Sequence, residues 1–231
     1  MTRGVVVTGG SRGIGLATVK RFHDVGCEVV SLSRSAPPLS GIDHIGADIE
    51  DLASVQQAAQ ALVSRVADWD QTVLVHNAAV HRHDSVSDLS PQDLLAVLSA
   101  NLVAPQILNA AFIPLMKPGS SVIYIGSTLA EKAVAGACSY VTSKHGLVGL
   151  MRATCQDLAG RGVHTACICP GFTDTDMLRA HAGAALGAIR EMVTAGRLLE
   201  PAEIADLVGV CADSPALNGA VIHANLGQVE R

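Results

Sequence analysis

One stretch near the start of the chain decides its fold: Gly4-Val5-Val6-Val7-Thr8-Gly9-Gly10-Ser11-Arg12-Gly13-Ile14-Gly15. Residues 4–8 form a short β-branched run, which is typical of a buried parallel strand. Apolar residues then recur at helical spacing over residues 16–25. A strand, a glycine-rich turn and a helix in this order predict a turn that binds the phosphates of a dinucleotide. The alternative is an ordinary glycine-rich turn between a strand and a helix.

Each glycine of this turn has a physical task. Gly9 permits the tight turn, Gly13 lets the backbone approach a pyrophosphate, and Gly15 lets the helix pack close to the strand. The exposed N–H groups at the start of the helix then receive the phosphates. The residues of this turn that we expect to contact the cofactor are Gly9, Ser11, Arg12, Gly13, Ile14 and Gly15.

The end of the second predicted strand bears on which dinucleotide binds. Residues 28–32 form that strand, and Ser33 and Arg34 follow it. Dinucleotide-binding folds place an Asp or Glu about 20 residues beyond the glycines to bind the ribose 2′-hydroxyl, and this chain has no carboxylate there. Arg12 and Arg34 can instead clasp a 2′-phosphate through charge-assisted hydrogen bonds. The sequence thus favours NADP(H) over NAD(H), although two solvated surface arginines would give the same pattern.

Strands and helices alternate along the rest of the chain. Apolar runs predict strands at residues 44–48, 72–76, 122–125, 163–169 and 220–223, with helical patterns at 52–66, 94–98, 103–116, 140–159 and 201–212. This alternation predicts an α/β fold in a single domain over residues 1–231: a doubly wound, Rossmann-type, mostly parallel seven-stranded sheet with helices on both faces. Residues 172–199 interrupt the rhythm with an Ala/Gly-rich helical stretch at 181–195, and we expect this insertion to cover the substrate.

A second motif carries candidate chemistry: Tyr140-Val141-Thr142-Ser143-Lys144. A phenol and an amine four residues apart lie one helical turn apart on the same face. An ammonium within about 4–6 Å lowers the pKa of a tyrosine from its ordinary value near 10, so that the phenol exchanges a proton near neutral pH. Ser127 follows the strand at 122–125, at the edge where open α/β sheets carry their sites. A solvated helix face can show the same Tyr–Lys spacing, so the motif is informative only together with the glycine turn.

Together these features resemble the short-chain dehydrogenase/reductase family, in the branch whose glycine motif is TGxxxGxG. The matching segments follow the family's order from residue 8 to about 225: residues 8–15, Asp48, His76-Asn77-Ala78-Ala79, Asn101, Ser127, residues 140–144 and Pro170-Gly171. The sequence departs from the family in two places. Ala79 replaces the last glycine of the usual Asn-Asn-Ala-Gly, which bears on the fit to the cofactor ribose. Asn225-Leu226-Gly227 replaces a C-terminal Asp-Gly-Gly, which bears on subunit contacts.

The resemblance implies a role for each matching residue. Tyr140 would be the acid/base, Ser127 would bind the reacting oxygen, and Lys144 would hold the nicotinamide ribose and lower the pKa of Tyr140. Asn101 would anchor a water molecule for proton relay, and Thr175 would hold the nicotinamide carboxamide. The other residues expected at the cofactor, besides Tyr140 and Lys144, are Ser33, Arg34, Asp48, Asn77, Ala78, Ala79, Pro170, Gly171 and Thr173.

Composition and charge argue against several other classes of protein. The net charge of −5 gives no reason to expect nucleic-acid binding. We expect no apolar run long enough to span a bilayer, and the chain enters a strand at once rather than through a signal peptide, so a cytoplasmic protein is predicted.

Cysteine and histidine patterns do not predict a metal site. The six cysteines contain no CxxC pair, and Cys167 and Cys169 are expected to point to one face of a strand as small core residues. His81 and His83 have a metal-ligand spacing but lack a third ligand, so we predict no metal there and expect that either histidine lines the substrate cleft instead.

The expected function is that of an NADP(H)-dependent oxidoreductase that interconverts a carbonyl compound and its secondary alcohol, with a moderately hydrophobic small-molecule substrate. Two alternatives stay open: an enzyme like 3-oxoacyl-carrier-protein reductase, suggested by residues 170–172 and 175–177, and a non-catalytic dinucleotide-binding regulatory protein. The substrate pocket would be built from loops 81–85, 129–138 and 172–199. By the same resemblance, helices at 101–116 and 140–158 are expected to form a homodimer or homotetramer.

Overall fold

The apolar β-branched runs of the sequence pair side by side in one seven-stranded sheet, and every pairing is parallel. The computed structural model describes residues 1–228. Its strands are β1 (Arg3–Thr8), β2 (Glu28–Ser33), β3 (Asp43–Gly46), β4 (Gln71–His76), β5 (Ser121–Ile125), β6 (His164–Pro170) and β7 (Ala220–Ala224). Their order across the sheet is β3-β2-β1-β4-β5-β6-β7. The predicted fold class is confirmed.

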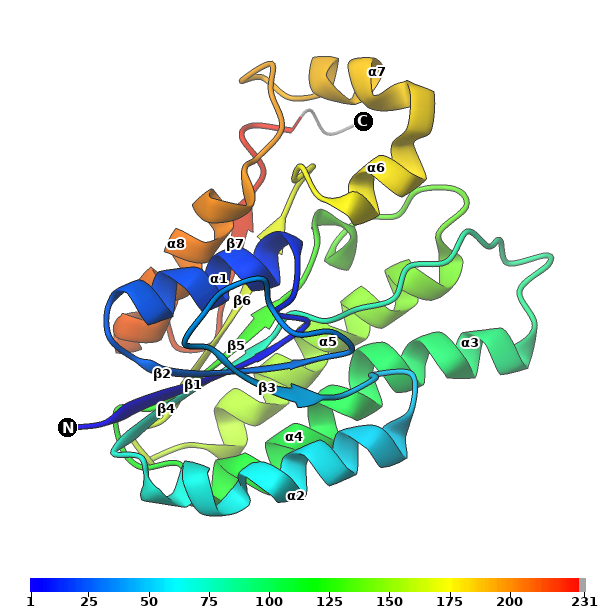
Figure 1. Cartoon of the computed structure of the whole chain (residues 1–231). Helices are drawn as coiled ribbons and strands as arrows, with labels where there is room; N and C mark the ends of the chain where they lie inside the picture. Colours follow the sequence, from blue (N-terminus) through cyan, green and yellow to red (C-terminus); the bar gives the residue numbers. More distant parts are fainter. Residues whose placement is uncertain (229–231) are drawn as a thin grey trace.

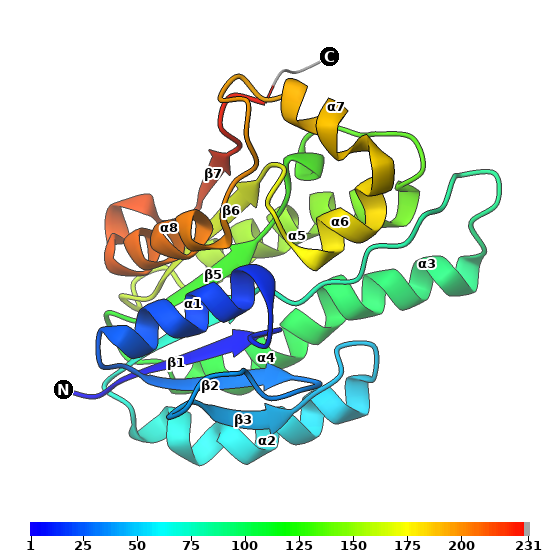
Figure 2. The same ribbon diagram turned by 45° about the horizontal axis from the view of Figure 1, so that its top comes forward.

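Helices cover both faces of the sheet (Figure 1). The α-helices are α1 (Gly13–Asp24), α2 (Leu52–Asp68), α3 (Pro91–Leu98), α4 (Ala104–Phe112), α5 (Cys138–Asp157), α6 (Asp176–Ala182), α7 (Leu186–Glu191) and α8 (Pro201–Asp213). A π-helical turn, η1 (Ser99–Val103), joins α3 to α4, and short 3₁₀ turns are η2 (Ile113–Leu115), η3 (Thr128–Ala130), η4 (Gly183–Ala185) and η5 (Pro215–Leu217). In Figure 2, α1 and α8 lie on one face, α2, α4 and α5 on the other, and α6 and α7 stand beyond the carboxyl ends of the strands.

The core divides between the two faces because successive side chains of a strand point in opposite directions. Val5 and Val7 of β1 pack with Phe22 of α1 and its neighbours. Val6 packs on the other side, in the cluster that includes Leu108 of α4. The sheet is thus buried on both sides, which explains why its strands are continuous apolar runs rather than alternating ones.

The chain changes direction across the sheet between β1 and β4. Strands β1, β2 and β3 are added toward one edge, and the chain then returns to the other side of β1 to form β4. The loops that leave β1 and β4 therefore part toward opposite faces and open a crevice at the carboxyl ends, which is where ligands bind in open α/β sheets.

The structure corrects two predicted boundaries. Strand β3 ends at Gly46, so Asp48 lies in the following loop, where its carboxylate accepts a hydrogen bond from Glu50 N at 3.1 Å. The helix predicted at 181–195 is instead two short helices, α6 and α7. The break falls at Gly183, whose φ of 50° is left-handed and stops α6.

A third correction concerns the length of apolar helix. The run Pro91–Leu115 is helical throughout, has a mean hydropathy of 1.6 over its most apolar window, and is long enough by length and composition to cross a membrane. The expectation that no apolar run approaches this length was therefore wrong. In the structure, Val97, Leu108 and Phe112 of this run are buried against the sheet and neighbouring helices, so its apolar character also serves the core.

Candidate active site

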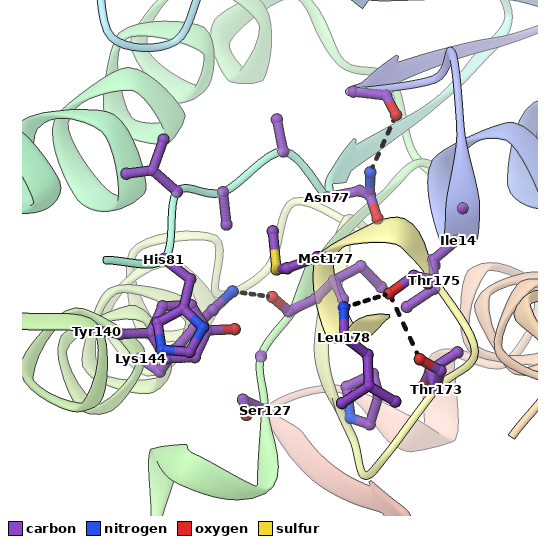
Figure 3. Close-up of a pocket in the computed structure, with 18 of the residues that line it drawn as sticks. Ile14, Asn77, His81, Ser127, Tyr140, Lys144, Thr173, Thr175, Met177 and Leu178 are labelled. Atoms are coloured by element: carbon purple, nitrogen blue, oxygen red, sulfur yellow. Dashed lines mark hydrogen bonds between the residues drawn. The ribbon is translucent and has the colours of Figure 1, made fainter. Parts of the chain in front are cut away.

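A cavity of about 570 Å³ lies along the carboxyl ends of the strands, and most of the predicted site residues line it (Figure 3). The predicted residues found in its wall are Gly9, Ser11, Arg12, Gly13, Ile14, Ser33, Arg34, Asp48, Asn77, Ala78, Ala79, Ser127, Tyr140, Lys144, Pro170, Gly171, Thr173 and Thr175. Gly15 and Asn101 are the two predicted site residues outside the wall. Residues far apart in the sequence are thus brought together at the carboxyl ends of the strands.

The start of α1 fits a dinucleotide's phosphates. No side chain caps this helix end, and its first turn holds no acidic residue, so its N–H groups are open to an anion. A Cβ atom at Gly15 would lie 2.1 Å from Gly9 O, so only glycine lets the helix come this close to the turn. Gly15 therefore shapes the site from behind, while the residues before it face the cavity.

The turn after β4 is fastened to the glycine turn. Asn77 Nδ2 donates to Thr8 O at 2.9 Å, and the backbone N–H groups of Asn77 and Ala78 donate to Thr8 Oγ1 at 2.9 and 3.0 Å. Ala79 is not among the residues with left-handed backbone, so its methyl group costs no backbone strain. The departure from the family's glycine is compatible with this turn.

The part of the cavity wall that follows β1 and β2 carries two arginines. Arg12 and Arg34 are exposed, and within residues 1–228 neither guanidinium takes part in an ion pair. Ser33 is buried, and its hydroxyl already donates to Ser35 O at 2.8 Å. Glu50 also lines the cavity, but its carboxylate pairs with Arg82 at 2.9 Å. The cationic groups are therefore freer to meet a phosphate than Ser33 is.

Helix α5 carries the Tyr–Lys pair into the middle of the cavity. Lys144 Nζ donates to Ile125 O at 2.8 Å and lies 5.5 Å from the centre of the Tyr140 ring (Figure 3). Ser127, just beyond β5, caps the short η3 turn: its Oγ accepts from Leu129 N at 3.1 Å. Because Leu129 uses only a lone pair of this oxygen, the Ser127 hydroxyl proton remains for a ligand oxygen.

The structure does not bring the Asn101 side chain to the cavity. Asn101 is 2% exposed within η1, where its Nδ2 donates to Val80 O and to Ser143 Oγ, both at 2.9 Å. Its Oδ1 accepts from Val80 N at 2.8 Å. The amide group therefore ties the loop after β4 to α5.

The far end of the cavity is mostly apolar, as expected. Leu129, Ala133, Val134, Met177 and Leu178 line it, whereas Ala135, Ala137 and Cys138 do not. His81 lines the wall and His83 does not. The rings of His81 and Tyr140 have centroids 4.3 Å apart, and the ring of His181 on α6 stacks on His81 at 3.9 Å. Burial, with a contribution from His181, lowers the pKa of His81 to about 4.

Several lining residues escaped the sequence reasoning. Leu32, Ser35, Ala47, Ile49 and Glu50 follow or end β2 and β3, so their place at the carboxyl ends of strands could have revealed them. Gln228 comes from the C-terminal segment, and no pattern in the sequence marks it, whereas Met192 lies within the predicted pocket segment 172–199. The described residues contain no group of three or more His, Cys, Asp or Glu side chains arranged to hold a metal ion.

Comparison with known proteins places this site in a family. The model of the short chain dehydrogenase family matches residues 3–184. The chain belongs to the short-chain dehydrogenase/reductase family. It is 33% identical to carbonyl reductase family member 4 of Danio rerio, over 98% of each chain. It is 29% identical to the 3-oxoacyl-[acyl-carrier-protein] reductase FabG of Escherichia coli, over 96% of this chain and 95% of that one.

Solved structures agree with this membership of the short-chain dehydrogenase/reductase family. The aldohexose dehydrogenase of Thermoplasma acidophilum superposes with a TM-score of 0.89 at 27% identity, covering 98% of this chain and 94% of that one. A short chain dehydrogenase from Burkholderia cenocepacia, solved in complex with NADP, superposes with a TM-score of 0.88 at 29% identity, covering 97% and 96%. The oxidoreductase class and the fold are thereby shown.

Proposed function

We propose that this protein is an NADP(H)-dependent oxidoreductase that interconverts a carbonyl compound and its secondary alcohol. The observation that carries the proposal is the convergence of Ser127, Tyr140 and Lys144 in the wall of a cavity that also contains the start of α1, whose first turn holds no acidic residue. The similarity to a carbonyl reductase and to a structure solved with NADP supports the same assignment.

A nicotinamide dinucleotide would lie along the cavity, and when bound it supplies or accepts the hydride. The start of α1 would hold its phosphates, Arg12 and Arg34 a 2′-phosphate, and Lys144 its nicotinamide ribose. The remaining proposed contacts come from Gly9, Ser11, Gly13, Ile14, Asp48, Asn77, Ala78, Ala79, Pro170, Gly171, Thr173 and Thr175, all in the cavity wall.

The chain's own part in the reaction is to orient the substrate and to move one proton. In carbonyl reduction, Ser127 donates a hydrogen bond to the reacting oxygen and Tyr140 gives that oxygen its phenolic proton. Lys144, held by Ile125 O, keeps a positive charge beside the phenolate that results. In alcohol oxidation Tyr140 takes the proton back.

The wider proposal covers the assembly and setting of the enzyme. We propose a single cytoplasmic domain whose segment at residues 172–199 covers the substrate, and a homodimer or homotetramer formed through the helices at residues 101–116 and 140–158. Val103, an exposed apolar residue in the first of these helices, supports that surface.

A second candidate is reduction of a 3-oxoacyl thioester. The 29% identity to FabG over nearly the whole chain favours it. Comparing turnover of a 3-oxoacyl thioester with that of a simple cyclic ketone distinguishes the two, because both reactions use the same Tyr140 and differ only in what the cavity accepts.

Replacing the proposed acid/base tests the function. Tyr140→Phe removes one hydroxyl group, so kcat for carbonyl reduction should fall by about 10³-fold, within the range that general acid catalysis contributes, while NADPH affinity stays within a few-fold. Rates are followed by the loss of NADPH absorbance, and affinity by titration.

The chain offers a matched control in Tyr124, its only other tyrosine. Tyr124 is fully buried away from the cavity, so Tyr124→Phe should retain kcat within a few-fold. Near-normal turnover in Tyr140→Phe, or an equal loss of kcat in both variants, would refute Tyr140 as the acid/base.

A further inference from the structure

The imidazole of His81 lies beside Tyr140, the proposed acid/base, in the cavity wall. Its half-buried ring lines the cavity next to Tyr140 (Figure 3), with the two ring centroids 4.3 Å apart, and the ring of His181 stacks on it at 3.9 Å. These two contacts hold the plane of the imidazole. Within residues 1–228, neither nitrogen of His81 makes a hydrogen bond. A polar edge that is held in place and left unpaired gains free energy when a ligand supplies the missing partner.

The cavity wall that contains His81 mixes apolar and polar side chains. Leu129, Val134, Met177 and Leu178 line the cavity, and so do Thr128, Lys132 and Asp176. The His181 ring that stacks on His81 has its Nδ1 engaged with Met177 O at 2.8 Å, which leaves Nε2 as its second ring nitrogen. A ligand oxygen beside Tyr140 can therefore meet imidazole nitrogens.

The charge state of His81 indicates which kind of ligand oxygen it can hydrogen-bond best. The titratable groups that act on it are Asp84 and His83 of its own loop, Lys144 of α5 and His181 of α6. Burial has a larger effect than any of these groups, and it lowers the pKa of His81 to about 4. At neutral pH the ring is uncharged, with one N–H donor and one acceptor nitrogen. That pair matches a hydroxyl group, which both donates and accepts, better than a carboxylate, which only accepts.

Resting on the proposed function, we propose that His81 is a substrate-recognition residue that hydrogen-bonds a second, uncharged oxygen on the carbon next to the reacting carbonyl. Its ring lies against the ring of Tyr140, which serves the reacting oxygen, so the two groups can address oxygens on neighbouring carbons. Hydroxyketones and vicinal diols are then preferred over the corresponding plain ketones and alcohols.

A matched pair of ketones tests the proposal. Reduction of 2-hydroxycyclohexanone and of cyclohexanone by NADPH is measured in the wild-type enzyme and in His81→Phe, which keeps an aromatic ring but removes both nitrogens. The quantity compared is the ratio of the two kcat/KM values, so that the different intrinsic reactivities of the ketones cancel between enzymes. The ratio should fall about tenfold in His81→Phe, as the loss of one hydrogen bond predicts.

The neighbouring loop supplies the control. His83 is exposed and lies outside the cavity wall, so His83→Phe makes the same chemical change two residues away and should keep the wild-type ratio. His81→Leu serves as a second variant if His81→Phe does not fold. An unchanged ratio in the folded His81 variant overturns the proposal, as does an equal fall in His83→Phe.

A binding measurement separates this inference from the proposed function. If the wild-type enzyme reduces neither ketone, the proposed function fails. The two ketones are then titrated onto Tyr140→Phe enzyme with NADPH present, with and without His81→Phe, and ligand binding is followed by cofactor fluorescence. Preference for the hydroxyketone that depends on His81 supports the recognition role without any turnover, and equal affinities overturn it.

Discussion

Two arginines in the cavity wall, Arg12 and Arg34, are the residues on which the proposed preference for NADP(H) depends. Arg34 follows β2 directly, where a carboxylate would serve NAD(H), and Arg12 belongs to the glycine turn. Both are exposed and, in the described part of the chain, outside any ion pair. Their charge is therefore available to a 2′-phosphate.

Arg34→Ala should weaken NADPH binding by about 10- to 100-fold, the range for losing a hydrogen bond to a charged group, and should change NADH binding by less than about twofold. The two dinucleotides differ only in the phosphate, so NADH is the internal control. Side-by-side titrations measure both affinities. An equal loss for the two cofactors would remove Arg34 from 2′-phosphate recognition.

Residues could be assigned from the sequence where a motif fixes both backbone and side chain. Tyr140 and Lys144 share a helix face by spacing alone, and the cavity wall contains both. Asn101 was harder, because its amide direction depends on the π-helical turn η1 and on Val80 and Ser143, which lie on other elements. Gln228 reaches the cavity only through the tertiary fold, and no local pattern could have revealed it.

At the scale of elements, one carboxylate fastens the helix that carries the Tyr–Lys pair. Helix α5 has no capping side chain of its own at Ala137. Asp84, from the loop after β4, accepts a hydrogen bond from Ser139 N at 2.9 Å and another from the Ser139 hydroxyl. The backbones also pair, from Asp84 N to Gly136 O at 3.2 Å. The negative charge of Asp84 at the N-terminus of α5 is also attracted to the positive end of the helix dipole.

Asp84→Ala should destabilise the fold by about 1–2 kcal/mol, as the loss of a helix cap does, and should lower kcat because Tyr140 lies one residue beyond Ser139. NADPH affinity should change little, since α1 is untouched. Asp88→Ala is the matched control: Asp88 accepts from Ser85 N at 2.7 Å in the same loop, whereas the hydrogen bonds from Ser139 of α5 go to Asp84. Similar kcat values in the two variants would contradict a positioning role for Asp84.

Element boundaries were predicted well where a helix or strand is long and its pattern strong. The break between α6 and α7 was missed because the Ala-rich composition of residues 181–195 favours one helix, while the left-handed backbone at Gly183 ends it. The apolar run from α3 to η2 was underestimated for a related reason: its two predicted helical stretches are joined by the π-helical turn η1 into one continuous helix.

On the scale of the whole molecule, a buried polar chain joins the sheet to its helices. His76 Nε2 of β4 donates to Asn109 Oδ1 of α4 at 2.8 Å, and Asn109 Nδ2 donates to Tyr124 Oη of β5 at 2.9 Å. Tyr124 Oη lies 3.1 Å from Thr154 Oγ1 of α5. Burial raises the pKa of Tyr124 to about 12 and lowers the pKa of His76 to about 4. Protonating His76 would place an unpaired charge in the core, because its Nδ1 has no hydrogen-bond partner among residues 1–228.

This chain of contacts predicts how stability depends on pH. Because the folded pKa of His76 lies below the unfolded value near 6.5, the unfolded state binds more protons between about pH 6.5 and 4, and the free energy of unfolding falls as the pH falls through that window. The His76 contribution to that loss is about 3 kcal/mol. Urea unfolding of the wild-type protein and of His76→Asn at several pH values measures it.

The difference in free energy of unfolding between the wild type and His76→Asn should narrow, or reverse, on going from pH 8 to pH 4.5. Only the wild type has an imidazole at this position that gains a proton on unfolding. At pH 8 the wild-type imidazole is neutral in both folded and unfolded states, which provides the reference point. Parallel pH dependences in the two proteins would show that His76 is not the group responsible.

The insertion that carries α6 and α7 begins and ends at one place on the sheet. Leu199 N donates to Phe172 O at 2.9 Å, and Asp174 N donates to Leu199 O at 2.8 Å, so the segment leaves β6 and returns to its starting point. Ser127 follows β5 and the Tyr–Lys pair lies on α5, so all three residues are outside this loop. Under the proposed function, residues 176–198 form an exchangeable cassette: selection can change their length and sequence while Thr175, Ser127 and the Tyr–Lys pair keep their places, so that the same proposed catalytic residues acquire new substrates.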